Sequence, residues 1–290
     1  MSLAHLTSPI CQAALRTYGK VAPGGRGAFR LVRHARRFIP RDRWRSTFKT
    51  DDGLHLDLDL AVYPDCCMAF GLYELDVARL LRRLLAEGDH FVDGGANLGY
   101  FTLLAARLVG PTGRVDAFEP QPQNTARLHA HLERNGLADR VHVHAEALSD
   151  AAGTANIHMF RGSDFNHGCA SLFGAAEAAS TATQVPTARM DELLADSSPR
   201  LIKLDIEGAE PLAVEGMAGL LGGPSAPRLI VEYNVQAAGK AGFAPRAWVD
   251  RLLAIQPAYK LHAIGRRLRL IDPDELFTDS VSEANVLAEV

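Results

Sequence analysis

From residue 90 onward, the chain alternates short apolar segments with segments of helical periodicity. The apolar segments of this core include HFVD (90–93), RVDAFEP (114–120), RVHVHAEAL (140–148) and LIKLDIE (201–207). Segments with apolar residues at helical spacing follow three of them, at 97–110, 123–136 and 209–223. Strands separated by helices of this length pair as a parallel sheet with helices on both faces. The alternation therefore predicts a doubly wound α/β fold.

Other segments extend this core on both sides. An Asp-Gly turn at 52–53 lies between two alternating segments and predicts a hairpin within 46–64, before a helix at 74–89. Further strands are expected at 154–160 and 228–234, a helix at about 245–255, and a closing hairpin at 259–264 and 267–271. Residues 161–181 are rich in small and polar residues without a clear period, so a loop that covers the site or links two elements is expected there.

Composition limits the class of protein. Apolar residues make up 47% and charged residues 22% of the 290 residues, which excludes collagen, coiled coil and full disorder. No stretch approaches the roughly 20 apolar residues of a membrane span, and no secretory signal is recognisable. The four cysteines lack metal-ligand spacing, so reduced thiols in a cytoplasmic protein are expected.

Charge is distributed unevenly along the chain. Residues 1–50 hold eleven Lys or Arg and one acid, whereas residues 51–290 have a net charge of −13. We therefore expect a basic N-terminal extension (1–50) and a main domain (51–290). A basic amphipathic segment within 26–45 could contact an anionic membrane, but packing on the acidic main domain is the favoured interpretation. Nucleic-acid binding is not expected, because the whole-chain pI is about 6.4.

The sequence FVDGGANLGYFT (91–102) is typical of a strand, a glycine-rich turn and a helix. Such a turn lets a ligand approach the backbone, and the helix start offers free N–H groups. Glu119 follows Gly99 by 20 residues at the end of the next strand, where an acid binds ribose hydroxyls in many nucleotide sites. These features alone are compatible with a dinucleotide such as NAD.

Asp93 discriminates between cofactors. It ends the strand immediately before the glycines, where the pyrophosphate of a dinucleotide would meet its negative charge. S-adenosylmethionine carries a sulfonium and an ammonium and no phosphate, so a carboxylate favours it. Capping of the following helix is the alternative role for Asp93, but Asn97 is better placed to cap.

A second group of polar residues follows the fourth core strand. Lys203, Asp205 and Glu207 alternate with apolar residues in LIKLDIEGAE, and Glu210 comes in the next turn. The first and fourth strands of a doubly wound sheet are neighbours, so Asp205 is expected to face the same crevice as Asp93. Glu207 and Glu210 could instead interact only with the helix dipole.

Taken together, these segments resemble the FkbM family of S-adenosylmethionine-dependent methyltransferases. The matching pieces, in family order, are FVDGGANLGYFT, AFEPQPQNTARL, EALSDAAGTANI, VPTARMDELL, LIKLDIEGAE and LIVEYN, within residues 70–235. The resemblance implies a Rossmann-like, seven-stranded sheet whose last strand is antiparallel. It also implies methyl transfer to a hydroxyl of a sugar, glycolipid or secondary metabolite, so a small-molecule or glycan acceptor is expected.

The resemblance also assigns roles by position within the cofactor site. Asp93, Gly95 and Asn97 would hold the methionine part, in the loop that Gly99 closes. Glu119 would hold the ribose diol, and Glu146 and Ala147 would lie near the adenine.

An alcohol acceptor loses its proton during transfer, so a base nearby assists the reaction. Asp205 is the first candidate, Glu207 the second and His167 a third. Metal-free catalysis is favoured over a divalent ion held by Asp205, Glu232 and Asn234, which end neighbouring strands. Two alternatives stay open at this point: an NAD(P)-linked oxidoreductase, and a non-catalytic binding protein on the same fold.

Overall fold

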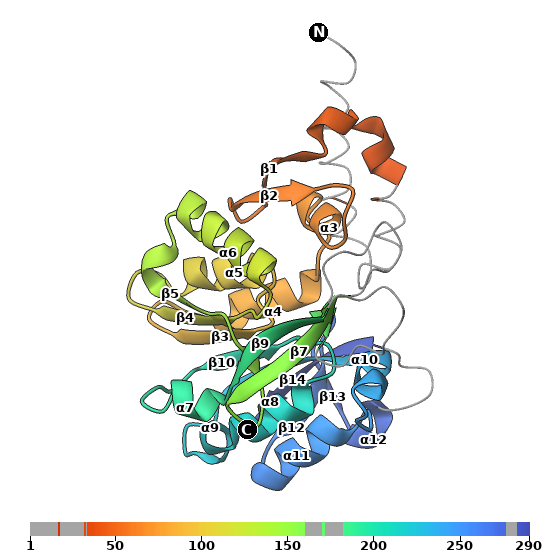
Figure 1. Cartoon of the computed structure of the whole chain (residues 1–290). Coiled ribbons are helices and arrows are strands. Elements are labelled where there is room, and N and C mark those ends of the chain that lie inside the picture. The colour runs from red at the N-terminus through yellow and green to blue at the C-terminus, as the bar shows by residue number, and fades with distance from the viewer. Residues whose placement is uncertain (1–16, 18–31, 33, 160–169, 172–181, 277–282) are drawn as a thin grey trace. The chain divides into compact units, whose positions relative to one another are not determined.

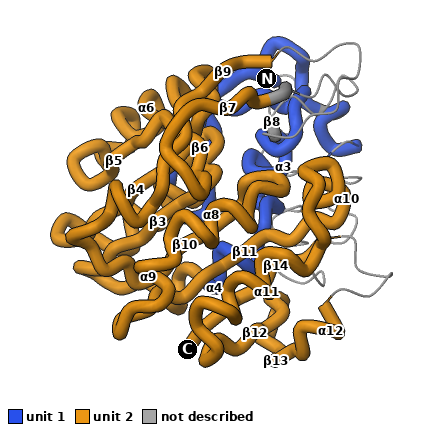
Figure 2. The backbone as a smooth tube through the Cα atoms, turned by 60° about the horizontal axis from the view of Figure 1, so that its bottom comes forward, with its two compact units in different colours: residues 1–80, 161–168 blue, residues 81–160, 169–290 orange. Residues whose placement is uncertain are grey.

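The computed structural model describes residues 17, 32, 34–159, 170–171, 182–276 and 283–290. The chain forms two compact units, which Figure 2 shows in blue and orange. Unit 1 comprises residues 1–80 and 161–168, and unit 2 comprises residues 81–160 and 169–290. The predicted site residues that the structure describes all belong to unit 2.

Unit 2 is built on an eight-stranded sheet in the order β13-β12-β14-β11-β10-β3-β4-β5. Its strands are β3 (His90–Gly94), β4 (Arg114–Phe118), β5 (Val141–His144), β10 (Leu201–Leu204), β11 (Arg228–Asn234), β12 (Lys260–Ala263), β13 (Arg269–Ile271) and β14 (Glu283–Glu289). Strands β5, β4, β3, β10 and β11 are parallel, and β14 pairs antiparallel with β11. The predicted sheet with an antiparallel last strand is confirmed, and β13 adds an eighth strand at one edge.

Helices cover both faces of this sheet, as Figure 1 shows. One face carries α5 (Tyr100–Leu108) and α6 (Pro122–Asn135), and the other carries α8 (Glu210–Gly216), α9 (Ala218–Gly222) and α11 (Ala247–Ile255). The second face packs a continuous apolar core against the strands. The remaining helices of unit 2 are α7 (Met190–Leu193), α10 (Val235–Lys240) and α12 (Pro273–Leu276), and α4 (Leu75–Leu84) spans the boundary between the units. The doubly wound prediction is therefore confirmed.

Two predicted elements of unit 2 are interrupted. The expected strand 140–148 breaks after His144, and β6 (Ala147–Leu148) pairs with β9 (Ala182–Ala188) in a second sheet. That sheet, in the order β6-β9-β7-β8, also holds β7 (Gly153–Met159) and β8 (Ala170–Ser171). The sequence analysis anticipated β7 but not β9, whose partners are distant in sequence. The expected helix 209–223 divides at Met217 into α8 and α9.

Unit 1 contains the predicted hairpin, in which β1 (Arg45–Lys49) pairs antiparallel with β2 (His55–Asp59). It also contains α3 (Asp65–Ala69) and two 3-10 turns, η2 (Arg36–Phe38) and η3 (Arg41–Arg43). Of the basic segment within 26–45, the structure describes residues 32 and 34–45. Its membrane contact stays a prediction, as does the boundary at residue 50.

Within the part of the chain that the structure describes, no helix has the length and apolar character needed to cross a membrane. Cys66 and Cys67 are free and buried in unit 1, while Cys11 and Cys169 lie outside the described residues.

Candidate cofactor and active site

The carboxyl ends of β3, β4, β10 and β11 lie side by side at one edge of the main sheet. The register places Asp93 opposite Lys203 and Gly94 opposite Leu204, so the first and fourth core strands are neighbours, as expected. The backbone N–H of Asp205 continues this pairing by donating to the Gly94 carbonyl at 3.0 Å. Asp93 and Asp205 are therefore brought to the same edge, where ligands of parallel sheets bind.

The glycine loop is held to the end of β4 by its own backbone. The N–H groups of Gly95 and Ala96 both donate to the Phe118 carbonyl at 3.0 Å. Asn97 has a φ of +51° and Gly99 a φ of +98°, and Gly99 is the N-cap of α5. The expectation that Asn97 caps this helix is wrong, because Gly99 is the N-cap and the side-chain oxygen of Asn97 accepts the adjacent Leu98 N–H at 2.8 Å.

Gly95 is required by a close approach of two strand ends. Its φ is +83°, and a Cβ built on it would lie 1.9 Å from the backbone oxygen of Asp205. A side chain at this position would separate the glycine loop from the end of β10. Gly95 therefore joins the predicted cofactor loop to the predicted catalytic acid.

Glu119 is 5% exposed and is held almost entirely by backbone groups. One carboxylate oxygen accepts the Asn97 N–H at 2.8 Å, and the other accepts the Gln121 N–H at 2.9 Å and the Asn124 amide at 3.4 Å. Burial outweighs these bonds and raises the pKa of Glu119 to about 7. The structure thus places Glu119 directly beside the glycine loop.

Asp93 is 1% exposed, and its two carboxylate oxygens differ. Oδ2 accepts the Thr102 hydroxyl at 2.6 Å, whereas Oδ1 is buried and has no hydrogen-bond partner among the residues that the structure describes. Burial raises the pKa of Asp93 above its usual value. A buried unpaired acceptor is costly unless a ligand satisfies it, so this oxygen suits the positive end of S-adenosylmethionine.

The predicted adenine residues lie where the main sheet gives way to the second one. Glu146 follows the end of β5 and its carboxylate is 3.9 Å from His144 Nδ1. Ala147, in β6, is buried and pairs with Thr187 of β9. No contact recorded among the described residues joins either of them to the glycine loop, so their role stays a prediction.

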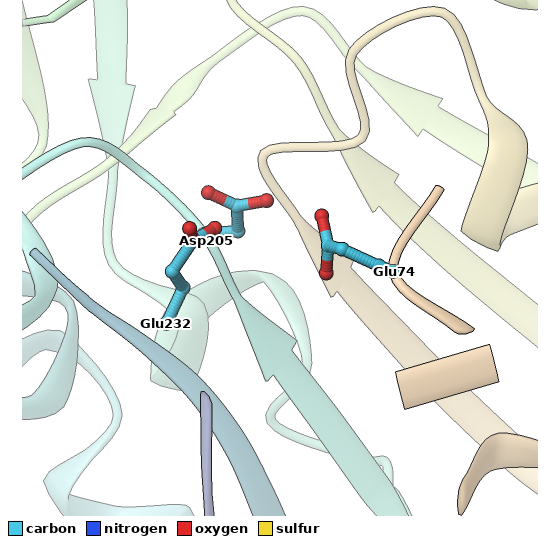
Figure 3. A group of neighbouring side chains, drawn as sticks. All are labelled: Glu74, Asp205 and Glu232. Atoms are coloured by element: carbon cyan, nitrogen blue, oxygen red, sulfur yellow. The ribbon is translucent and has the colours of Figure 1, made fainter. Parts of the chain in front are cut away.

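Asp205 forms an ion pair within its own strand end. Lys203 Nζ donates to Asp205 Oδ2 at 2.8 Å, and the side chains are 1% and 18% exposed, respectively. The carboxylates of Asp205 and Glu232 face each other in Figure 3, with ligand oxygens within 4.8 Å and a hydrogen bond between them. Glu74, labelled in the same figure, belongs to unit 1.

The environment of Asp205 favours its ionised form. Burial alone would raise its pKa, but the charge of Lys203 and hydrogen bonds from Glu232 and Lys203 outweigh burial. The pKa of Asp205 therefore lies below its usual value. Asp205 is thus a carboxylate at neutral pH and remains partly exposed, as a proton acceptor for a ligand must be.

The other acids of this segment have different surroundings. One oxygen of Glu210 accepts the backbone N–H groups of Ile206 and Gly208, both at 3.2 Å, so Glu210 stabilises the turn that precedes α8. Burial raises its pKa to about 7. Glu207 lies in that turn with a φ of +53° and is half-buried. Its role as the second candidate base stays a prediction.

Asn234 is the N-cap of α10, where its side-chain oxygen accepts the backbone N–H groups of Gln236 and Ala237. The bonds are 3.0 and 3.1 Å long. This oxygen is therefore used by the helix, which weakens the alternative of a metal held by Asp205, Glu232 and Asn234.

His167 and most of the predicted loop 161–181 lie outside the described residues. Thr102 and Lys203 were not among the predicted site residues, although both contact predicted site acids. The apolar alternation around Lys203 placed it on the same face as Asp205, which was the available signal. For Thr102 the sequence carried no signal, because its contact with Asp93 depends on how α5 packs on β3.

A mostly parallel sheet with a glycine loop after its first core strand, and acids at the ends of β3, β4, β10 and β11, is typical of the class of Rossmann-like methyltransferases. A family model, the methyltransferase FkbM domain, matches residues 93–260, more than half of the chain. The chain belongs to the FkbM methyltransferase family, and it is a methyltransferase that uses S-adenosylmethionine. The alternative of an NAD(P)-linked oxidoreductase is set aside.

Several solved structures are similar to this chain. A SAM-dependent O-methyltransferase from Thermotoga maritima is 16% identical, with 74% of this chain and 64% of that chain covered and a TM-score of 0.41. TomG, an O-methyltransferase from Streptomyces achromogenes involved in tomaymycin synthesis, is 15% identical, with 74% and 78% covered and a TM-score of 0.43. An rRNA methylase from Streptococcus thermophilus is 15% identical, with 73% and 93% covered and a TM-score of 0.40. A comparison with curated proteins found no match.

Proposed function

We propose that this chain transfers the methyl group of S-adenosylmethionine to a hydroxyl oxygen of a small molecule or glycan. A sugar, a glycolipid or a secondary metabolite is the acceptor class that we favour. The observation that carries the proposal is the partly exposed carboxylate of Asp205 at the end of β10, which is paired with Lys203 at 2.8 Å. Its backbone N–H bonds the Gly94 carbonyl, so it adjoins the glycine loop.

S-adenosylmethionine, when bound, supplies a methyl group that its sulfonium already activates. The chain's contribution is to align the acceptor and to remove a proton. Asp205 would accept the hydroxyl proton, Asp93 Oδ1 would face the ammonium of the cofactor, and Glu119 would accept the ribose hydroxyls. Gly95 would hold these groups at their separation, because its missing side chain lets β10 approach the loop.

The charge at the strand ends supports a neutral acceptor. Asp93 lies on β3, Asp205 directly follows the end of β10, and Glu232 lies on β11. Lys203 is paired with Asp205. A phosphate or carboxylate group beside these acids would be repelled. A hydroxyl group can donate to a carboxylate and avoids this repulsion, which favours oxygen methylation of an uncharged acceptor.

Calorimetric titration with S-adenosylhomocysteine tests the cofactor site, with NAD as the matched control ligand. We expect micromolar binding of the first and none of the second, because Asp93 repels a pyrophosphate. Absence of S-adenosylhomocysteine binding by the folded protein would support the non-catalytic alternative, a binding protein on the same fold.

Methyl-labelled S-adenosylmethionine then tests the acceptor, with a panel of simple glycosides. For each glycoside that takes up label, the matched control is its deoxy analogue, which lacks one hydroxyl. We expect label only where the hydroxyl is present. Label that persists in the deoxy analogues, or that appears only on amines in a parallel panel, would contradict oxygen methylation.

A further inference from the structure

Lys203 is a buried cation in the fourth core strand, and the residues around it account for its burial. Its side chain is 1% exposed, and the register places it opposite Asp93 of β3. Burying an ammonium group is costly unless a negative charge and hydrogen bonds compensate it. Here the compensation is Asp205, whose Oδ2 accepts from Nζ at 2.8 Å.

A second contact fixes the ammonium from another direction. Nζ lies 4.9 Å from the centroid of the Phe101 ring of α5, a distance at which the ring face attracts a cation. Both contacts favour the charged form of the lysine. Because Asp205 is 18% exposed and Lys203 only 1%, a ligand can reach the carboxylate while the ammonium remains behind it.

Among the described residues of unit 2, the other ionisable groups that face Asp205 are acids. Asp93 approaches from β3, Glu232 from β11 and Glu210 from α8. The like charges of Asp93 and Glu210 favour a protonated Asp205, whereas the hydrogen bond to Glu232 favours its ionised form. Lys203 supplies the positive charge that opposes the two like charges.

We propose that Lys203 is a positioning residue for methyl transfer: its ammonium holds Asp205 as an oriented carboxylate that accepts the proton of the acceptor hydroxyl. This inference rests on the proposed function. In the step, the hydroxyl oxygen forms a bond to the methyl carbon, and the bond from that carbon to sulfur breaks with its electron pair left on sulfur. The hydroxyl proton goes to Asp205. Lys203 keeps its three protons throughout, so it does not act as the base.

Carbon-13 NMR of the full chain with labelled aspartate carboxyls tests the inference without any acceptor. The Asp205 signal is assigned by its absence in Asp205→Asn. In Lys203→Met, we expect the titration midpoint of Asp205 to rise by about one pH unit or more, because a close positive charge is removed. Lys260→Met is the matched control, since Lys260 is exposed on β12, and it should leave the midpoint unchanged.

A folded Lys203→Met variant with an unchanged Asp205 midpoint would overturn the inference. If Lys203→Met does not fold, the reciprocal measurement uses Asp205→Asn and labelled lysine side chains, of which the chain has five. Loss of the carboxylate should then lower the titration midpoint of Lys203 by about one pH unit or more. A midpoint that stays in place would equally refute the coupling.

Measurements of methyl transfer distinguish a positioning role of Lys203 from a purely structural role. Lys203→Met should move the acid limb of the kcat profile to higher pH. The profile is recorded at saturating S-adenosylmethionine, because Lys203 also lowers the pKa of Asp93 in the cofactor site. Lys203→Arg keeps the charge and should restore the position of that limb. A variant that loses cofactor affinity and stability with no movement of the limb would show a structural lysine. If no hydroxyl acceptor is found, the proposed function fails, while the NMR result still decides the coupling.

Discussion

The two halves of the strand-end edge hold their acids in different ways. In the half formed by β3, β4 and the glycine loop, Glu119 is held chiefly by backbone N–H groups of Asn97 and Gln121. In the half formed by β10 and β11, Asp205 is held by the side chains of Lys203 and Glu232. The first arrangement depends on the path of the chain, and the second depends on the charge of particular side chains.

This difference has a consequence for the pKa values of the two acids. Backbone N–H groups do not outweigh burial at Glu119, whose pKa is raised to about 7. At Asp205 the charge of Lys203, together with hydrogen bonds to Glu232 and Lys203, outweighs burial, and the pKa is lowered. The raised pKa of Glu119 favours a cofactor-binding role, in which the acid gains its best hydrogen-bond partners from the ligand. The lowered pKa of Asp205 favours the role of a proton acceptor that is ionised before the reaction.

The largest expected effect lies in the β10 half. Asp205→Asn should lower methyl transfer by roughly 10²- to 10⁴-fold, because the amide cannot accept the hydroxyl proton. Cofactor affinity should change little, since Glu119 and Asp93 remain. The measurement is kcat with the acceptor from the labelling panel, alongside calorimetry. Turnover near the native level would assign the base elsewhere, with Glu207 next to be tested.

The junction of the two halves is tested by Gly95→Ala with Gly136→Ala as its matched control. Both glycines have positive φ, +83° and +64°, but a Cβ at Gly136 meets nothing within 4 Å. Left-handed backbone should cost the control roughly 1–2 kcal/mol of unfolding free energy. Gly95→Ala should lose about 1–3 kcal/mol more through its clash with the Asp205 oxygen. Equal losses in urea unfolding would show that the close approach is unimportant.

In the half formed by β3, β4 and the glycine loop, Glu119→Ala should weaken cofactor binding by roughly 1.5–3 kcal/mol through lost charge-assisted hydrogen bonds. This corresponds to roughly a 10- to 150-fold rise in the dissociation constant of S-adenosylhomocysteine. Glu133→Ala, on the exposed side of α6, is the control and should bind normally. An unchanged constant in folded Glu119→Ala would remove this residue from the site.

The smallest expected effect is the pH dependence of cofactor binding. Ribose hydroxyls donate to an ionised carboxylate, so binding favours the deprotonated form of Glu119. With the pKa of Glu119 at about 7, affinity should fall as pH is lowered through 7. From pH 8 to pH 6 the fall should be about tenfold. Calorimetry over this range measures it, and Glu119→Gln should flatten the profile. Affinity that rises on acidification would reverse the assigned sign.

Much of the fold and of the cofactor half was predictable, because the signals are local. Helical and strand periodicity predicted β3, α5, β4 and α6 in order, and the glycine loop and Glu119 follow from short-range spacing. The prediction of the helix cap was wrong, because the local preference of a residue type competed with the backbone conformation at that position. Asn97 has the chemistry of a helix cap, but its left-handed backbone turns its side chain to the adjacent N–H, and Gly99 begins the helix.

The β10 half was predictable only in outline. The alternation in LIKLDIE placed Lys203 and Asp205 on one face, but it did not show that the lysine would be buried and the acid partly exposed. Likewise, the short strands β6 and β9 pair across a long stretch of chain, and no pattern within either strand names its partner.

The sequence by itself determined the class of fold, the position of the glycine loop and the identity of the family, since periodicity and motif spacing act over short distances along the chain. The tertiary structure decided which acids are ionised. Burial depends on residues far apart in sequence, such as Asp93 and Lys203, that meet only when the sheet forms. The electrostatic field at a strand end is the sum over all neighbouring strands, and no single segment contains that sum.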